Sequence, residues 1–336
     1  MLEQTYPNPI KAGAQQQFLL HDKNVPRRVI VDPGQANLPL HPHPFREVYQ
    51  SASGDYVAVG RLPTRNQFFN DGPVGATDPL HLAEFIRQGV EVISRALLDV
   101  PFEHTFILKK TKLTLDPLFE RADDYAELDH FVVVPKSQVR RRGDGTAYAA
   151  DGPFACMAED QHIATYEGTV AFLQPEAYKS TRGGDDAPEY GDPQGWVEPL
   201  DPVCVGKRKI ENVLIGAAAR HEQGMTALLI PQARPPYFDR PLDHYPGMMM
   251  AEAARQLTVL MAYLNSDVLP DQVHVTSIEM DFKSFAELNT QPTLHAVATS
   301  KPAQWQDFKV TVKQADAVRA SFAIQTRFVR QERGAR

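Results

Sequence analysis

The feature that most constrains the fold of this chain is an internal repeat. Residues of one segment recur in the same order in a second segment 168 positions further on, the distance from Glu84 to Glu252. The matched pairs are Ala83 and Ala251, Glu84 and Glu252, Arg87 and Arg255, Gln88 and Gln256, Pro63 and Pro231, and Asp71 and Asp239. Self-similarity at one fixed offset indicates a duplication. The chain is therefore expected to contain two copies of one fold.

Each copy reads as one long helix accompanied by strands. Apolar residues at helical spacing predict a helix over 79–98, and a second apolar run predicts one over about 244–264. Runs rich in β-branched and aromatic residues, bounded by turn residues, predict strands in both copies. These strands are expected at 48–65, 102–115, 131–139, 146–156 and 162–173, then at 227–231, 273–282, 293–298, 308–312 and 317–329. A long helix combined with a run of strands is an α+β pattern.

Composition places the boundaries between the copies. Residues 1–45 are rich in Pro, His and Asn and follow no periodic pattern, which predicts an N-terminal arm. Residues 181–205 combine Gly, Pro and Asp with few apolar side chains, a composition typical of a linker. We therefore expect the first repeat over 46–180 and the second over 206–336.

The same composition narrows the classes of function. Apolar residues make up 43% of the chain, which is enough for a core, and the net charge of -7 disfavours nucleic acid as a partner. Cys156 and Cys204 are too far apart in sequence to indicate a disulfide framework or a thiolate metal site. His41 and His43 have no second ligand pair nearby, so no metal is expected. With neither a signal-peptide pattern nor a membrane-spanning segment, we expect a cytoplasmic protein that does not contact a membrane.

Charged residues recur on helices that are otherwise apolar. Because positions i, i+3 and i+4 of a helix share one face, Glu84, Arg87 and Gln88 are expected to lie together, and so are their three counterparts. One interpretation is an intrahelical ion pair that contributes roughly a few tenths of a kcal/mol and nothing else. The other interpretation is function, because a charge on a buried helix is costly unless a partner or a purpose retains it.

Both segments resemble a known family. The second reads DHYPGMMMAEAARQ at 243–256 and resembles the signature of the A-factor synthase family, and the first reads DPLHLAEFIRQ at 78–88 and resembles the N-terminal version of that signature. The similarity covers most of residues 46–330. It implies a tandem hotdog fold, in which each copy wraps an antiparallel sheet around a long central helix. The two copies would then pair as a pseudo-dimer within one chain.

The resemblance also implies an activity. Members of the family transfer a β-ketoacyl group from a thioester on acyl carrier protein to the hydroxyl of dihydroxyacetone phosphate, which yields a precursor of a γ-butyrolactone, butenolide or furan. No cofactor is implied. The family pattern places a functional Glu in the first repeat and a functional Arg in the second, which correspond to Glu84 and Arg255. We interpret Glu84 as a general base, and Arg255 as the group that holds the phosphate or the oxyanion.

Other polar residues of the two segments are candidates for substrate binding. Arg87 and Glu252 are the counterparts of the two functional residues in the other repeat, and Gln88 and Gln256 could orient them through side-chain hydrogen bonds. The remaining candidates, His81 and His244, stand near the two helix starts. For these histidines, capping or packing is the alternative role.

Three other functions stay open. The helix motif also resembles that of hotdog dehydratases, which place a catalytic His about fourteen positions before the helix acid. Those positions hold Asn70 and Phe238 here, so dehydration is the weaker interpretation. Hydrolysis of the thioester is a further alternative. Outside the enzymes, a duplicated hotdog could bind a lactone or an acyl ligand without turnover.

The implied acyl carrier protein is acidic, which directs attention to basic clusters. Such clusters occur at 140–142, 207–209 and 327–336, where we expect exposed turns and ends. One of them is a candidate docking site for the carrier protein. Because a pseudo-dimer forms within one chain, both a monomer and a homodimer are open.

Overall fold

The computed structural model describes most of the chain between residues 28 and 329. The described residues are 28–30, 44–62, 68, 71–72, 78–117, 128–183, 197–230, 243–266, 268–301 and 303–329. Several residues singled out from the sequence lie outside these ranges, namely His41, His43, Pro63, Asn70, Pro231, Phe238 and Asp239. The predicted boundaries at 45, 180 and 205 stay a prediction.

The first half combines one long helix with a set of short and long strands. The helix α1 (Pro79–Leu97) follows β2 (Phe45–Gln50) and β3 (Tyr56–Gly60), and the short β1 (Arg28–Ile30) pairs with β2. The remaining elements are β4 (Thr105–Leu115), β5 (His130–Val134), the 3-10 turn η3 (Lys136–Gln138), β6 (Val139–Arg141), β7 (Ala147–Asp151), β8 (Phe154–Ala158), β9 (Gln161–Leu173) and α2 (Pro175–Thr181). The sequence predicted neither β1 nor α2.

The second half repeats the main elements of the first, two strands, a long helix and four further strands, without counterparts of β6, β7 and α2 among the described residues. It starts with 3-10 turns η5 (Pro202–Val205) and η6 (Ile210–Asn212) and the hairpin of β10 (Ile215–His221) and β11 (Gly224–Leu229), and the long helix α3 (Gly247–Asn265) follows. After the turn η7 (Pro270–Gln272) come β12 (Val273–Phe282), β13 (Thr293–Ala298), β14 (Trp305–Gln314) and β15 (Ala317–Phe328). The predicted bounds of β12 and β13 are confirmed.

One antiparallel sheet runs through both halves. Its order is β1-β2-β3-β5-β8-β9-β4-β12-β15-β14-β13-β11-β10, and β4 pairs with β12 at the joint, where Leu113 lies opposite Ile278. Read outward from this joint, β4-β9-β8-β5-β3-β2 corresponds strand for strand to β12-β15-β14-β13-β11-β10. The strand order therefore has a pseudo-two-fold relation between the halves, as the duplication predicted.

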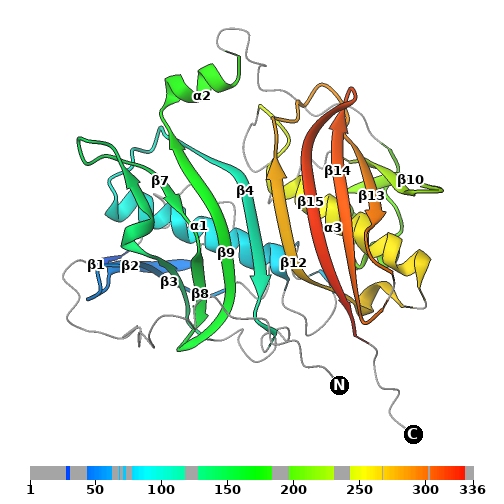
Figure 1. The fold of residues 1–336 in the computed structure, drawn as a ribbon, viewed down its shortest axis with the longest axis horizontal. Helices are drawn as coiled ribbons and strands as arrows, with labels where there is room; N and C mark the ends of the chain where they lie inside the picture. The colour runs from blue at the N-terminus through cyan, green and yellow to red at the C-terminus, as the bar shows by residue number, and fades with distance from the viewer. Residues whose placement is uncertain are drawn as a thin grey trace, which may run out of the picture.

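The two long helices lie on the same side of this sheet. Figure 1 shows α1 and α3 behind the strands of their own halves, with β4 and β12 side by side in the middle. The helices contact each other, and α1 also contacts β12 of the other half. One large apolar cluster extends through both halves, and a smaller one lies in the first half. These features confirm the predicted α+β tandem hotdog with a pseudo-dimer inside one chain.

Local sequence explains where the helices begin and how closely they approach the sheet. Asp78 caps α1, because its Oδ1 accepts the backbone N–H groups of Leu80 at 2.8 Å and His81 at 3.2 Å. Gly89 lets α1 approach β5, since a Cβ atom at this position would lie 2.8 Å from Val132 Cγ2. Gly247 lets the start of α3 pack on the ring of Phe282, which a Cβ atom would approach to 2.9 Å.

Two elements differ from the predicted ones. The strand predicted over 146–156 is divided into β7 and β8, which Gly152 and Pro153 separate. Proline has no backbone N–H to donate to a sheet ladder, so it interrupts a strand. The helix predicted from about 244 begins at Gly247, which leaves Asp243 and His244 in the segment before it. No helix within the described ranges is both long and apolar enough to cross a membrane.

Candidate functional site

The first repeat places a polar triad on the buried face of α1. Arg87 donates to both carboxylate oxygens of Glu84, from Nε at 2.9 Å and from Nη2 at 2.7 Å, and Gln88 Nε2 donates to Oε1 of Glu84 at 2.7 Å. Arg87 also pairs with Glu91 at 3.2 Å, and its side chain is 17% exposed. The i, i+3 and i+4 spacing therefore brings the three predicted residues together. We call Glu84, Arg87 and Gln88 the first triad.

The second repeat forms the equivalent arrangement on α3, which we call the second triad. Arg255 donates to Glu252 from Nε at 2.8 Å and from Nη2 at 2.5 Å, and Gln256 Nε2 donates to Glu252 at 2.8 Å. A fourth residue, Lys207, places its Nζ 3.2 Å from Glu252 Oε1. Burial alone would raise the pKa of Glu252, but Arg255 and Lys207 lower it to about 2. Glu252 is therefore held as a carboxylate between two cations.

Lys207 is a member of this site that the sequence did not indicate. It belongs to a basic cluster expected at an exposed turn, yet its side chain is 0% exposed. Its Nζ donates to the backbone oxygen of Phe68 at 2.9 Å, and it stands 4.8 Å from the centre of the Phe68 ring. Burial lowers the pKa of Lys207. The prediction of an exposed turn is wrong for Lys207, because this side chain connects a loop of the first half to α3.

Asp71 strengthens the same connection between the halves. Its Oδ2 accepts the backbone N–H groups of Arg208 at 3.2 Å and Lys209 at 2.9 Å, and the side-chain amide of Asn212 at 2.8 Å. Asp71 comes from the first half, whereas all three donors come from the second. The repeat had singled out Asp71, and its role here is to hold the two halves together around the second triad.

The start of α1 also approaches the second triad. Burial raises the pKa of Asp78, and Arg255 and Lys207 oppose this rise through their positive charges. His81, one turn into α1, is buried, and burial together with His130 and Lys207 lowers its pKa to about 3. A histidine with this pKa is neutral at physiological pH. His81 is thus part of the packed joint between the halves.

The two triads differ in how their glutamines are used. Gln256 Oε1 accepts the backbone N–H of Leu214 at 2.8 Å, and its Nε2 donates to the backbone oxygen of Asn212 at 2.8 Å. The Oε1 atom of Gln88 is buried and has no hydrogen-bond partner among the described residues. Because Glu84 can only accept, the amide nitrogen of Gln88 must face it, which leaves Oε1 pointing away.

Two buried hydroxyl groups accompany the first triad. Tyr166 on β9 is close enough to Glu84 and Arg87 for their charges to influence its phenol, and burial raises the pKa of Tyr166 to about 12. Within the described part of the chain, neither Tyr166 Oη nor the nearby Thr111 Oγ1 has a hydrogen-bond partner by geometry. Buried polar atoms in native proteins are mostly paired. Thr111 nevertheless lies close enough to Tyr166 for its hydroxyl to oppose the rise in the pKa of the phenol. The first triad thus lies beside two buried hydroxyl groups that are neighbours of each other.

Glu84 and Arg255 are each paired within their own helix. Each of these residues is bonded to its neighbour on its own helix, Glu84 to Arg87 and Arg255 to Glu252. This is the intrahelical pairing that the spacing allows. The link between the halves comes instead from Lys207 and Asp71, and from the approach of α1 to the second triad.

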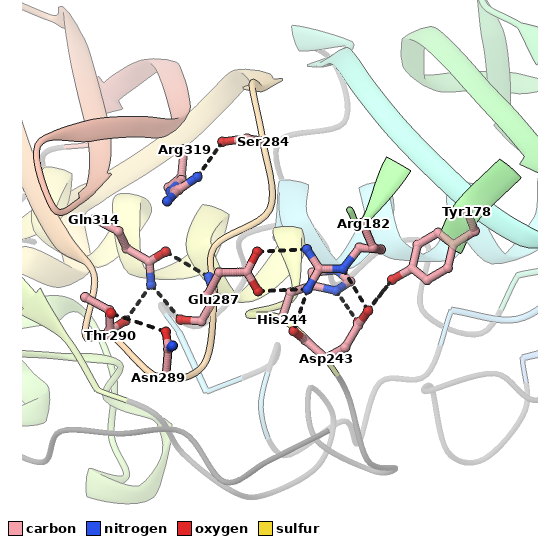
Figure 2. Close-up of polar contacts among 10 residues, drawn as sticks. All are labelled: Tyr178, Arg182, Asp243, His244, Ser284, Glu287, Asn289, Thr290, Gln314 and Arg319. Carbon is pink, nitrogen blue, oxygen red and sulfur yellow. Dashed lines mark hydrogen bonds and ion pairs between the residues drawn. The ribbon is translucent and has the colours of Figure 1, made fainter. Parts of the chain in front are cut away.

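A second polar cluster lies just before α3, and Figure 2 shows its side chains. His244 Nδ1 is 2.6 Å from Asp243 Oδ1, and Asp243 also accepts from the Tyr178 hydroxyl at 2.8 Å and from Arg182 Nε at 2.9 Å. Arg182 in turn binds both oxygens of Glu287 at 2.8 Å. Burial alone would raise the pKa of Asp243, but His244, Tyr178 and Arg182 hold it well below its usual range.

These residues form one cluster that joins three segments. We call it the dyad cluster, after the pair of Asp243 and His244, and it consists of Tyr178, Arg182, Asp243, His244 and Glu287. Tyr178 and Arg182 belong to α2 and its end, and Glu287 follows β12. The ring of Phe285 packs against His244 with its centre 4.7 Å away, and the Arg182 guanidinium stands 4.3 Å from the same ring centre. Of these residues, the sequence indicated only His244. Arg182 falls in the stretch predicted as a linker, where no pattern distinguishes it.

Comparison with known proteins identifies what this arrangement is similar to. Both repeats match the A-factor biosynthesis hotdog domain (AfsA), over residues 45–173 and 191–330. A relative in Streptomyces coelicolor, named 2-oxo-3-(phosphooxy)propyl 3-oxoalkanoate synthase, is 31% identical over 62% of this chain and 65% of its own length, slightly under two thirds. Proteins with the same name in Streptomyces griseus and Streptomyces virginiae are 29% and 28% identical, over 66% and 71% of this chain and 76% and 77% of their own lengths.

Solved structures show the same fold at low sequence identity. A protein described as an oleoyl thioesterase of Lactobacillus plantarum superposes with a TM-score of 0.52 at 12% identity, covering 82% of this chain and 97% of that one. The dehydratase domain of RzxB from Pseudomonas fluorescens superposes with a TM-score of 0.50 at 11% identity, covering 84% and 98%. These structures share the fold alone. The match of both repeats to the family model, over most of the chain, establishes that the chain belongs to the family of A-factor biosynthesis hotdog domains.

Proposed function

We propose that this chain is an acyltransferase that joins a β-ketoacyl group to the hydroxyl of dihydroxyacetone phosphate. The name shared by the relatives describes such an ester. A 3-oxoalkanoate is an acid with a keto group on its third carbon, and the 2-oxo-3-(phosphooxy)propyl group is the alcohol part of dihydroxyacetone phosphate. The match of both repeats to this family, at the registers that contain the two triads, is the observation that supports the proposal most directly.

The donor in this proposal is a β-ketoacyl thioester on acyl carrier protein. Attack of the hydroxyl oxygen on the thioester carbonyl forms the ester and releases the carrier thiol. The step needs a group that takes the hydroxyl proton, donors for the oxyanion, and a cation for the phosphate. It needs no cofactor. The product would be a precursor of a γ-butyrolactone or a related butenolide or furan.

Glu84 and Arg255 remain our candidates for residues that the reaction requires. Glu84 is bonded to Gln88, whose buried Oε1 has no hydrogen-bond partner among the described residues, and this supports a position beside the substrate. Arg255 is a cation with a planar fork suited to a phosphate or an oxyanion. Arg87 and Gln88 would hold Glu84 in place through their hydrogen bonds to it. Glu252, which is itself bonded to Gln256, would hold Arg255 in place.

The function is tested by incubating the protein with a β-ketoacyl carrier protein and dihydroxyacetone phosphate. Mass spectrometry should detect a phosphorylated ester, and its appearance should require both substrates. Alanine at Glu84 or at Arg255 should abolish ester formation while circular dichroism still reports a folded protein. Lys207 continues to compensate Glu252 in the Arg255 variant, so folding should survive there. A free acid or a dehydrated acyl product would instead favour hydrolysis or dehydration.

A further inference from the structure

We propose that His244 takes the proton from the acceptor hydroxyl and returns it to the leaving thiolate, with Asp243 as the residue that orients its ring. This inference rests on the acyl transfer proposed above. It assigns the proton transfer to a residue outside both triads.

The hydrogen bond to Asp243 determines which nitrogen of His244 can act. Asp243 is held as a carboxylate and can only accept, so His244 Nδ1 must carry the hydrogen in their 2.6 Å contact. In the neutral ring, Nε2 then presents a lone pair. The side chain of His244 is 24% exposed, so a substrate can approach it. Nε2 is therefore available as a proton acceptor in a fixed tautomer.

Asp243 is itself held in place by a half-buried tyrosine and a buried arginine. The Tyr178 hydroxyl and Arg182 Nε both donate to it, and Arg182 Nη2 also donates to its backbone oxygen at 2.9 Å. Glu287 binds the other side of the guanidinium, and the backbone of Glu287 is fixed in turn by Gln314. A base whose partner is oriented by a third group is the general arrangement of an activated proton-transfer site. The dyad cluster supplies these layers for His244.

From the pseudo-two-fold relation, we expect the dyad cluster to lie on the side of the first triad. Asp78, which caps α1, lies near enough to the second triad for Arg255 and Lys207 to act on its carboxylate. The position in α3 that corresponds to Asp78 at the 168-residue offset is Pro246. Because the strand order of one half repeats in the other, the start of α3 is expected to approach the first triad in the same way. His244 stands two residues before Pro246.

Glu84 has less room to accept a proton. A carboxylate has about four lone-pair sites, and three N–H groups of Arg87 and Gln88 already occupy the two oxygens of Glu84. His244 offers a whole lone pair on a separate atom. The division of labour that follows leaves the first triad to hold the acceptor, while His244 moves the proton.

His244 accepts one proton in this step and returns it, so the step balances. Nε2 accepts the hydroxyl proton as the oxygen forms its bond to the thioester carbon, and the ring becomes an imidazolium paired with Asp243. When the carbon–sulfur bond of the tetrahedral intermediate breaks, the imidazolium gives the proton to the leaving sulfur. The products are the ester and the carrier thiol, and His244 returns to its starting form. Among the described residues, Asp243 contacts this ring directly, Tyr178 and Arg182 contact Asp243, and Glu287 contacts Arg182.

The experiment compares H244A with the unaltered protein and with H221A, using the full chain and both substrates. His221 is exposed at the end of β10, where it contacts Thr226, so H221A should leave activity unchanged. Removal of a general acid–base residue typically costs about 100-fold or more in kcat. H244A should show such a loss with little change in KM, and added imidazole should restore part of the lost activity. E84A should show no rescue by imidazole.

Two further variants protect this test against misfolding. H244Q keeps a polar side chain of similar length, and D243N keeps the shape of Asp243 while permitting the wrong tautomer of His244. Both should lose kcat, D243N less than H244Q. The inference is overturned if H244A or H244Q keeps kcat within about threefold of the unaltered protein, or if imidazole fails to rescue a folded H244A. A lack of ester with the unaltered protein would reject the proposed function itself, which separates the two failures.

Discussion

The two triads contain the same three residues on equivalent helices, but their surroundings differ. The second triad is bonded on every side, with Lys207 beside Glu252 and with both atoms of the Gln256 amide tied to backbone groups. The first triad borders Gln88 Oε1, which has no hydrogen-bond partner among the described residues, and the Tyr166 hydroxyl, whose neighbour is Thr111. The side chain of Arg87 in this triad is 17% exposed. We infer that duplication supplied two copies of the triad. The second triad now holds the two halves together, whereas the first kept polar groups that can bind a ligand.

The largest difference should appear in the free energy of unfolding of E252A and E84A. Loss of Glu252 leaves Lys207 and Arg255 buried without their common partner, and breaking a buried ion pair in this way costs about 3–5 kcal/mol. Loss of Glu84 leaves Arg87 partly exposed and still paired with Glu91, so about 1–2 kcal/mol is expected. Urea denaturation of both variants measures the contrast. Equal losses would show that the two triads do not differ as described.

Lowering the pH should reduce the free energy of unfolding by protonating the same residue, Glu252. The pKa of Glu252 is about 2 in the folded protein against an ordinary value of 4.5. A carboxyl group with a lowered folded pKa contributes stability that is present above the unfolded pKa and lost as the pH falls toward the folded one. About 3 kcal/mol should therefore disappear between roughly pH 5 and pH 2. The acid dependence of stability should be smaller in E252Q by about this amount, and an unchanged dependence would remove Glu252 as its source.

Substitution of Gln256 and of Gln88 allows a matched comparison of smaller losses in stability. Gln256 to Met would leave the backbone N–H of Leu214 and the oxygen of Asn212 without their present partner, at a cost of about 2–3 kcal/mol. Gln88 to Met removes one hydrogen bond to Glu84 and an oxygen that has no partner among the described residues, so less than about 1 kcal/mol is expected. Thermal unfolding of both variants distinguishes these values. A greater loss for Q88M would contradict the inferred division between joint and ligand site.

The parts of this comparison that depend on local spacing could be predicted from the sequence. The i, i+3 and i+4 positions brought Glu84, Arg87 and Gln88 together, and apolar periodicity predicted both long helices and most strands. Strand β10 was missed because Gly216 and the alanines after it have low β propensity, and pairing with β11 overrides that preference.

The contacts between segments could not be predicted in the same way. Lys207 stands in a basic triplet that resembles any exposed turn, and only the docking of the two halves buries it against Glu252 and Phe68. Arg182 lies in a stretch predicted as a linker, and its partners Asp243 and Glu287 are 61 and 105 positions away. Such contacts depend on how the two copies assemble, which no local pattern encodes.

The smallest effect on stability should come from Y166F, and it separates a structural role from a substrate role most sharply. The Tyr166 hydroxyl is buried and has no hydrogen-bond partner by geometry within the described residues, so its removal should change the free energy of unfolding by no more than about 0.5 kcal/mol. If the phenol donates to a substrate oxygen beside the first triad, Y166F should raise KM for dihydroxyacetone phosphate or lower kcat about fivefold to tenfold, since one hydrogen bond contributes about 1 kcal/mol or slightly more. Steady-state kinetics and thermal unfolding of the same preparation measure both quantities. A variant with unchanged stability and unchanged kinetics would place the substrate away from Tyr166, and the asymmetry between the triads would then be a matter of packing alone.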